Sequence, residues 1–437
     1  MHYPVRMQTR VAQRRRGPLP FPTATASAAV LLALVSGAAA GQADIPWPDY
    51  RGPAADGRIE GAAVPTTWSE SENLHWRTPI HGRGWSTPVA SSERIWLTTA
   101  TEDGRSLSIL AVDVETGEVE VDRVLFEVDE PQERHDLNSF ASPSCVLDER
   151  RVYVHFGDAG TACLDQESGE TVWLRRDIRC DHMVGPGSSP ILFEDLLVFH
   201  VDGIDVQFVI ALDKATGETR WETVRNVDLT DREPDLRKAY STPIVVASEG
   251  REVLISTGAE ATFGYDPRTG EELWMLRHGG FSMSSRPVAG DGLVFLNTGF
   301  NKPRLIAKRI GGSGDVSQSH VAWSTLKSTP TMPSPILHDG LLYMVSDNGM
   351  ASCLDARTGE ERWRERLDGA FSASLLLVDD RLYAFDRDGV CTVLRAGGTF
   401  EVLARNELSD GCMASPIVVG DRLIVRTQNA LYALGGG

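Results

Sequence analysis

The chain has 437 residues, of which 61 are acidic and 43 basic, for a net charge of −18. Such an acidic surface repels phosphate backbones, so nucleic-acid binding is excluded as a main function. The six cysteines include no Cys-x-x-Cys pair, which excludes covalent haem and argues against a zinc ribbon.

The first forty residues have the pattern of an export signal. Five arginines precede a short apolar stretch at residues 24–35, and Ala38-Ala39-Ala40 offers small residues for cleavage. The stretch is too short to span a membrane, and no cysteine lies nearby for a lipid anchor. The pattern predicts a periplasmic or secreted protein, with residues 1–40 as signal peptide, 41–72 as an N-terminal extension and 73–437 as the folded domain.

A phrase of the form Asp-x-x-(Thr/Ser)-Gly-Glu-x-x-Trp recurs along the rest of the chain. It occupies residues 165–173, 213–221, 266–274 and 355–363, and a copy at 113–121 ends in Val. Asp, Thr and Gly favour a tight turn, and the indole that follows is large enough to pack between neighbouring units. We therefore predict structural interblade positions for Trp173, Trp221, Trp274 and Trp363.

A second phrase, consisting of a small residue, Ser or Thr, Pro and an aliphatic residue, opens each repeat. Short apolar runs separated by Gly-containing turns follow it, and the repeats are about 47 residues long. This length predicts an all-β fold, an eight-bladed β-propeller with four antiparallel strands per blade. The eight anchor residues are Pro88, Pro143, Pro190, Pro243, Pro287, Pro335, Leu375 and Pro416.

The last repeat has only three apolar runs before the chain ends. Residues 73–77, which include Trp76, supply a fourth run from the N-terminal side. We expect this segment to pair with the C-terminal strands and close the ring, since open sheet edges invite aggregation. The cysteines replace small apolar residues in strands, so we expect buried free thiols, with a Cys145–Cys163 disulfide as the alternative.

Together the two phrases resemble the pyrroloquinoline-quinone (PQQ) repeat of quinoprotein alcohol dehydrogenases and, more distantly, of the BamB-type outer-membrane assembly propeller. The resemblance covers about residues 45–435. The stretches 47–53 and 82–88 resemble the exported PQQ-like propellers of planctomycete-type genomes. In the dehydrogenases the resemblance implies PQQ, calcium, an Asp base and a pair of adjacent cysteines. This chain has no adjacent cysteines and no matching carboxylate set, so no catalytic residue, cofactor or metal site is predicted.

The residues before each anchor should lie near the axial channel, because the first strand of a blade lines the axis and ligands favour its mouth. Positive charge there would form a basic funnel for a small anion, and Arg286 would grip a carboxylate with its planar fork. The plainer interpretation is that these are polar channel residues bound to water. The candidate ligand-binding residues are His135, Asn138, His182, Lys238 and Arg286.

Complete structural repeats without catalytic motifs predict a monomeric, non-catalytic, exported scaffold that binds a protein or a small anionic ligand. One alternative is a PQQ-dependent dehydrogenase with a reduced active site, which would bind PQQ and calcium. The other is an envelope-assembly scaffold of the BamB type, against which the missing lipid-anchor cysteine counts.

Overall fold

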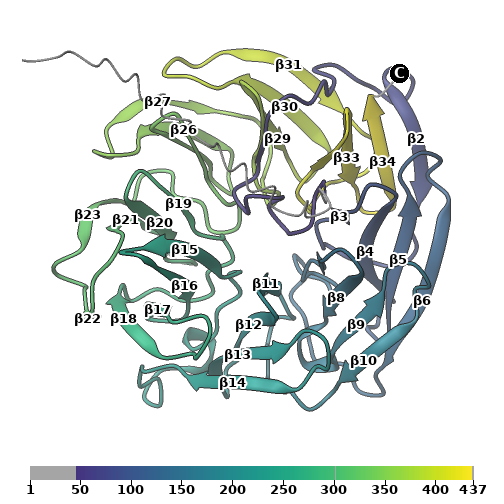
Figure 1. Cartoon of the computed structure of the whole chain (residues 1–437). Helices are drawn as coiled ribbons and strands as arrows, with labels where there is room; N and C mark the ends of the chain where they lie inside the picture. The colour runs from purple at the N-terminus through teal and green to yellow at the C-terminus, as the bar shows by residue number, and fades with distance from the viewer. Residues whose placement is uncertain (1–45, 301, 436–437) are drawn as a thin grey trace, which may run out of the picture. The chain divides into compact units, whose positions relative to one another are not determined.

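The computed structural model describes residues 46–300 and 302–435 (Figure 1). The expected signal peptide, residues 1–40, lies outside them. The described residues form eight sheets arranged in a ring, together with two short 3-10 helices, η1 (Gly157–Ala159) and η2 (Pro234–Leu236). The eight-bladed β-propeller predicted from the repeats is thereby confirmed. None of the helices in the described part of the chain is long and apolar enough to cross a membrane.

Blades one to four follow one another along the chain, and each runs from an inner strand to an outer strand. Blade one contains β3 (Val89–Ala90), β4 (Arg94–Ala100), β5 (Ser106–Asp113) and β6 (Val119–Glu127). Blade two contains β7 (Val146–Leu147), β8 (Arg151–His155), β9 (Thr161–Asp165) and β10 (Thr171–Arg175). Blade three contains β11 (Ile191–Phe193), β12 (Leu196–Asp202), β13 (Gln207–Asp213) and β14 (Thr219–Val224). Blade four contains β15 (Ile244–Ser248), β16 (Arg251–Thr257), β17 (Ala261–Tyr265) and β18 (Glu272–Arg277), with β22 (Gly314–Asp315) added in parallel at its outer edge.

Blades five to eight complete the ring. Blade five contains β19 (Val288–Gly290), β20 (Leu293–Asn297), β21 (Leu305–Arg309) and β23 (Val321–Thr325). Blade six contains β24 (Ile336–His338), β25 (Leu341–Val345), β26 (Met350–Asp355) and β27 (Glu361–Arg366). Blade seven contains β28 (Leu376–Val378), β29 (Arg381–Phe385), β30 (Val390–Arg395) and β31 (Val402–Glu407), with β1 (Arg58–Ile59) parallel to β28. Blade eight contains β32 (Ile417–Val419), β33 (Arg422–Arg426), β34 (Ala430–Gly435) and β2 (Leu74–Pro79).

Blade eight joins the two ends of the domain. Its outer strand β2 pairs in antiparallel fashion with β34, and the N–H of Gly435 donates to the carbonyl of Asn73 at 2.7 Å. The pairing expected for residues 73–77 is therefore present, and every blade has four antiparallel strands.

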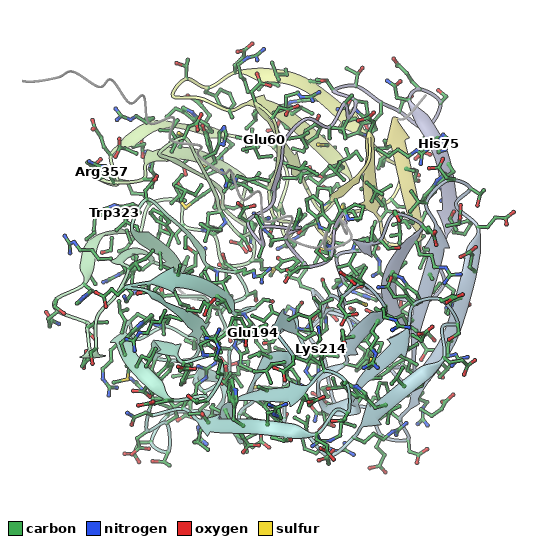
Figure 2. All side chains as sticks on the ribbon, in the orientation of Figure 1. Glu60, His75, Glu194, Lys214, Trp323 and Arg357 are labelled. Carbon is green, nitrogen blue, oxygen red and sulfur yellow. The ribbon has the colours of Figure 1, made fainter. Side chains whose placement is uncertain are left out.

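The repeated Asp-to-Trp phrase connects neighbouring blades. In blade six, Asp355 Oδ1 accepts hydrogen bonds from the turn N–H groups, including that of Thr358 at 2.9 Å. Gly359 has a φ of 74°, and a Cβ there would lie 2.7 Å from the indole of Trp323 in blade five. That indole donates its N–H to the carbonyl of Ala356 at 3.0 Å, and Figure 2 shows Trp323 and Arg357 close together at the rim. The turn of one blade thus receives the indole of the preceding blade.

Four other blades use the same contact, whereas Trp274 lies against Gly264 of its own blade and beneath the ammonium of Lys308. Trp76, Trp173, Trp221 and Trp363 donate to the carbonyls of Val114, Lys214, Pro267 and Gly397 in the following blades. Trp221, Trp274 and Trp363 are buried, and Trp173 is half-buried. Small residues lie opposite these indoles, with Cys163 opposite Trp173 and Cys353 opposite Trp363. All six cysteines are buried with free thiols, so the expected free thiols are confirmed and no Cys145–Cys163 disulfide forms.

Candidate functional site

A circle of eight residues surrounds the axis at the start of the inner strands, and we name it the channel ring. At seven of its eight junctions, the backbone N–H of one member donates to the side-chain hydroxyl of the next at 2.9–3.2 Å. At the remaining junction the guanidinium of Arg286 donates to the carbonyl of Pro243 at 3.0 and 3.2 Å. The members are Thr87, Ser144, Ser189, Thr242, Arg286, Ser334, Ser374 and Ser415.

The channel ring explains why Ser or Thr precedes most anchors in the sequence, since its hydroxyl satisfies a buried backbone N–H of the neighbouring blade. It also corrects the anchor of blade two. Ser144 occupies the ring position, and β7 begins at Val146. The anchor of blade two is therefore Cys145, and the assignment to Pro143 was wrong by two residues.

A cavity of about 430 Å³ lies on the axis beside the channel ring. Its walls carry hydroxyl, aromatic and titratable side chains, together with Asn138 and the apolar Leu137, Val184, Met332 and Met413. Hydroxyls come from Thr87, Ser142, Ser144, Ser189, Thr242, Ser282, Ser284, Thr331, Ser372 and Ser415. Aromatic rings come from Tyr50, Trp85, Tyr240, Phe281 and Phe300, and titratable groups from His135, Asp235 and Lys238.

Residues 47–59, which we name the strap, cross the inner part of the ring (Figure 1) and bring Tyr50 to the cavity wall. Trp47 exchanges two backbone hydrogen bonds with Ala90 of blade one, at 3.0 and 2.7 Å. Arg51 donates to the carbonyl of Leu375, before blade seven, at 2.7 Å. Tyr50 lines the cavity and makes a hydroxyl hydrogen bond of 3.1 Å with Ser374. In Figure 1 the purple trace of the strap crosses the inner part of the ring.

Arg286 does not line the cavity, so its predicted role is corrected. Its side chain is only 2% exposed, and its guanidinium forms a buried ion pair with the carboxylate of Asp49 in the strap. One nitrogen pairs with Oδ1 and the other lies 3.3 Å from Oδ2. The bidentate grip expected for a ligand carboxylate is thus made to the chain itself.

Lys238 lines the cavity, but its charge is neutralised. Its Nζ forms an ion pair with Asp235 and donates to the backbone carbonyl of the same residue at 2.7 Å. The ammonium also lies 5.9 Å from the ring centre of Phe281. Since Lys238 and Arg286 are both paired, the predicted basic funnel is not present.

His135 and Asn138 lie on the cavity wall, as predicted. The imidazole of His135 is exposed, and its Nδ1 accepts the N–H of Leu137 at 3.1 Å. The Asn138 carboxamide donates to the carbonyls of Val184 and Pro186, at 2.8 and 3.1 Å, and so joins two interblade loops. Asn138 therefore fixes the wall, while the Nε2 side of His135 is left for other contacts.

His182 lies away from the axial cavity, which corrects the fifth candidate. Its ring is buried beside Cys180, with Nε2 3.3 Å from Sγ. Burial lowers the pKa of His182 to about 4, so the imidazole is neutral at physiological pH. A neutral buried ring in a loop packed between blades has a structural role.

The candidate list missed residues that the structure brings to the cavity. Tyr50 reaches it from the strap, and Asp235, Phe281 and Phe300 reach it from loops. Tyr50 belongs to the stretch 47–53, whose resemblance to exported PQQ-like propellers makes it distinctive in the sequence. Nothing in the sequence around the other three indicates that their loops converge on the axis.

The residues present do not fit PQQ and calcium. Calcium takes several oxygen ligands, and of the described residues lining the cavity only Asp235 carries a carboxylate, which already binds Lys238. Residues 46–300 and 302–435 contain no group of three or more His, Cys, Asp or Glu placed to hold a metal ion. The carboxylates of PQQ would also need unpaired cations, and Lys238 and Arg286 are already paired.

Known proteins similar to this chain share its repeats. The PQQ_2 family model, described as "Outer membrane protein assembly factor BamB", matches residues 61–176, 205–336 and 314–434. The BamB of Yersinia pestis is 22% identical over 268 residues, covering 50% of this chain and 66% of its own length. The BamB of Nitrosomonas eutropha is 23% identical over 300 residues, covering 66% and 67%. The chain thus spans about two thirds of the length of these relatives.

Solved structures show the same architecture. BamB from Moraxella catarrhalis aligns with a TM-score of 0.56 and 13% identity, covering 83% of this chain and 99% of its own. Quinohemoprotein alcohol dehydrogenase from Comamonas testosteroni aligns with a TM-score of 0.64 and 13% identity, covering 90% and 81%. At these identities the likeness shows a shared fold and nothing about chemistry.

Proposed function

Because the chain belongs to the family described as outer membrane protein assembly factor BamB, we propose that it is an exported, non-catalytic scaffold that binds a protein partner in the cell envelope. The names of its relatives support an assembly role, and the paired charges of the cavity support a non-catalytic one. Cleavage near residue 40 is part of this proposal, and N-terminal sequencing of the exported protein tests it.

The observation that carries the proposal is the placement of exposed apolar side chains around the cavity mouth. Leu137, Met183, Phe300 and Leu326 are 39%, 41%, 60% and 60% exposed. All four lie in loops at the end of the blades where the inner strands begin, which we name the mouth face, and Leu137 and Phe300 also line the cavity. Exposed apolar groups gathered on one face mark interaction sites, and loops on a rigid scaffold often carry them.

The part of the mouth face that belongs to blades one to four is held rigid by contacts between its loops. Residues 128–145, 176–190 and 225–243 form long interblade loops that are tied to one another. Gln132 Nε2 donates to the carbonyl of Cys180 at 2.9 Å, and the Tyr240 hydroxyl donates to the carbonyl of His182 at 2.7 Å. A preformed surface of this kind loses little conformational entropy on binding, as suits a scaffold.

Site-specific photo-crosslinking tests the proposal in the native envelope. A crosslinking residue placed at position 137 or 326 should capture the same partner band. The matched control is position 224 on the outer strand of blade three, where Val224 is 72% exposed. A band formed from 224 as strongly as from the mouth face, or no band from any of the three positions, would contradict the proposed surface.

Titration with PQQ and calcium separates this proposal from a quinone-dependent dehydrogenase. Because Lys238 and Arg286 are already paired, we expect no shift in melting temperature and no saturable change in quinone absorbance. A stabilised, spectrally altered complex would instead support the enzyme.

A further inference from the structure

We propose that the axial cavity binds a neutral saccharide of one or two sugar rings. The cavity volume of about 430 Å³ lies in the range typical of small-molecule sites. Tyr50 of the strap lines the cavity, and so do Leu137 and Phe300 of the mouth face, from which a ligand would enter. This inference does not depend on the protein partner proposed above, because it concerns the interior of the ring.

The charge of the cavity selects a neutral ligand. Lys238 and Asp235 are the oppositely charged groups on its wall, and they form an ion pair with each other. Of the arginines nearby, Arg286 is buried against Asp49, and Arg387, which does not line the cavity, donates its Nε–H to the hydroxyl of Ser372 at 2.8 Å. A ligand anion would have to compete with Asp235 for Lys238, and a ligand cation would have to compete with the buried Lys238 for Asp235, whereas a neutral ligand leaves the pair intact.

The hydroxyls of the channel ring match a ligand that is rich in hydroxyl groups. Five members line the cavity, and each accepts one backbone N–H. Among the described residues, no protein acceptor binds the O–H proton of Thr87, Ser144, Ser189, Thr242 or Ser415. A hydroxyl offers one donor and two acceptor lone pairs, so each keeps a free donor and a free lone pair. Adjacent hydroxyls of a sugar both donate and accept, and such a circle of groups satisfies them.

Aromatic side chains above the channel ring supply faces for the apolar side of a sugar. Trp85 lines the cavity, and the guanidinium of Arg83 lies 5.0 Å from its ring centre. Phe281 and Phe300 form an edge-to-face pair with ring centres 6.2 Å apart. Flat aromatic rings beside free hydroxyls fit the C–H faces and O–H edges of a sugar ring.

Calorimetric titration of the full mature protein with glucose, maltose, cellobiose and diacetylchitobiose tests the inference. We expect saturable binding of at least one of these sugars. Phe300→Ala should weaken that binding by about fivefold, the scale of one aromatic contact. Leu326→Ala is the matched control, because Leu326 is equally exposed at 60% but does not line the cavity, and it should bind as the wild type does. Absence of binding by all four sugars, or equal weakening in both variants, would overturn the inference.

Asp235→Asn tests the charge argument separately. This change leaves Lys238 without its counter-ion, so the variant should bind glucuronate at least tenfold more tightly than the wild type. Glucuronate binding by the wild type that equals or exceeds binding of glucose would show that the cavity does not select neutral ligands. Neither outcome bears on crosslinking at the mouth face, so the two proposals fail independently.

Discussion

Arg286 occupies the only position of the channel ring where a cation stands in place of a hydroxyl. Its guanidinium donates to the carbonyl of Pro243 and binds Asp49 of the strap. The sequence predicted that this arginine would bind the carboxylate of a ligand, and that prediction was wrong because the carboxylate it binds belongs to Asp49. The partner could not be found from sequence, because Asp49 lies 237 residues away and no local pattern connects the two.

Removing the Arg286 side chain should destabilise the fold. In Arg286→Ala the carboxylate of Asp49, only 14% exposed, loses its counter-ion, and the free energy of unfolding should fall by about 3–5 kcal/mol. Urea denaturation measures this. The double variant Asp49→Ala/Arg286→Ala should lose less than the sum of the two single variants, since neither charge is then left alone. Additive losses would show that the ion pair contributes nothing.

Three buried imidazoles, His155, His182 and His200, should make the protein sensitive to acid. Burial lowers the pKa of His155 to about 3 and of His182 to about 4, and it lowers the pKa of His200 as well. The unfolded chain takes up these protons near the ordinary pKa of about 6.5, so it binds more protons than the folded chain between about pH 4 and 6.5. The free energy of unfolding should therefore fall as the pH is lowered through this window.

Urea denaturation at several pH values between 4 and 7 measures the effect. His182→Gln should give a shallower fall in stability with decreasing pH than the wild type. Phe156→Leu is a matched core change without a titrating group, and it should lower stability by a similar amount at each pH. An unchanged slope in His182→Gln would assign the acid sensitivity to other groups.

The strands of a blade follow from local turn chemistry, which is why the sequence predicts them well. In blade six the phrase at 355–363 predicts a turn followed by an indole, and Trp363 lies in the outer strand β27 directly after that turn. The distant pairing of β2 with β34 was foreseen from the missing fourth strand of the last repeat, but two other strands with distant partners were not. The strands β1 and β22 are two residues long and exist through parallel pairing with β28 and β18 of other repeats. Pro143 misled the assignment of blade two, because a proline beside Ser144 imitates the usual anchor.

The contact between an indole and the next turn should account for much of the cohesion between blades. Trp221 is 9% exposed, packs against Gly270 and donates to the carbonyl of Pro267 at 3.1 Å. Trp221→Ala should lower the free energy of unfolding by about 3–5 kcal/mol, as expected for a large cavity. Trp173→Ala, at a half-buried indole, should cost less, and equal costs would indicate that burial does not set the energy of this contact.

At the scale of the whole ring, closure depends on a strand from the N-terminal side. Deletion of residues 44–80 would remove the strap and β2, and would expose the edge of β34 and the indole site on blade one. The melting temperature should fall sharply and the protein should aggregate, because an unpaired edge recruits other chains. Deletion of residues 44–60 alone keeps β2 and serves as the control. Light scattering that is equal for the two deletions would contradict the closing role of β2.

The candidate site was only partly predictable. The sequence placed His135, Asn138 and Lys238 near the axis, and they line the cavity, because their distance from an anchor is a local property. The electrostatics of the site was not predictable in the same way. Lys238 is neutralised by Asp235, three residues away in the sequence. Arg286 is neutralised by Asp49, which is 237 residues away in the sequence. Which charges meet depends on the three-dimensional path of the loops and the strap.

The single arginine of the channel ring breaks a symmetry. Eight similar blades offer eight nearly equivalent rotational positions to any segment that lies across the axis. The seven hydroxyls of the channel ring do not distinguish these positions. The Asp49 carboxylate binds the one cation of the ring, which lies before blade five. With the strap in this position, Arg51 donates to the carbonyls of Pro335 and Leu375. Arg286 therefore determines which of the eight blades the strap contacts through Asp49. Moving the arginine one blade onward, in Arg286→Ser/Ser334→Arg, would shift the favoured docking angle of the strap by one eighth of a turn.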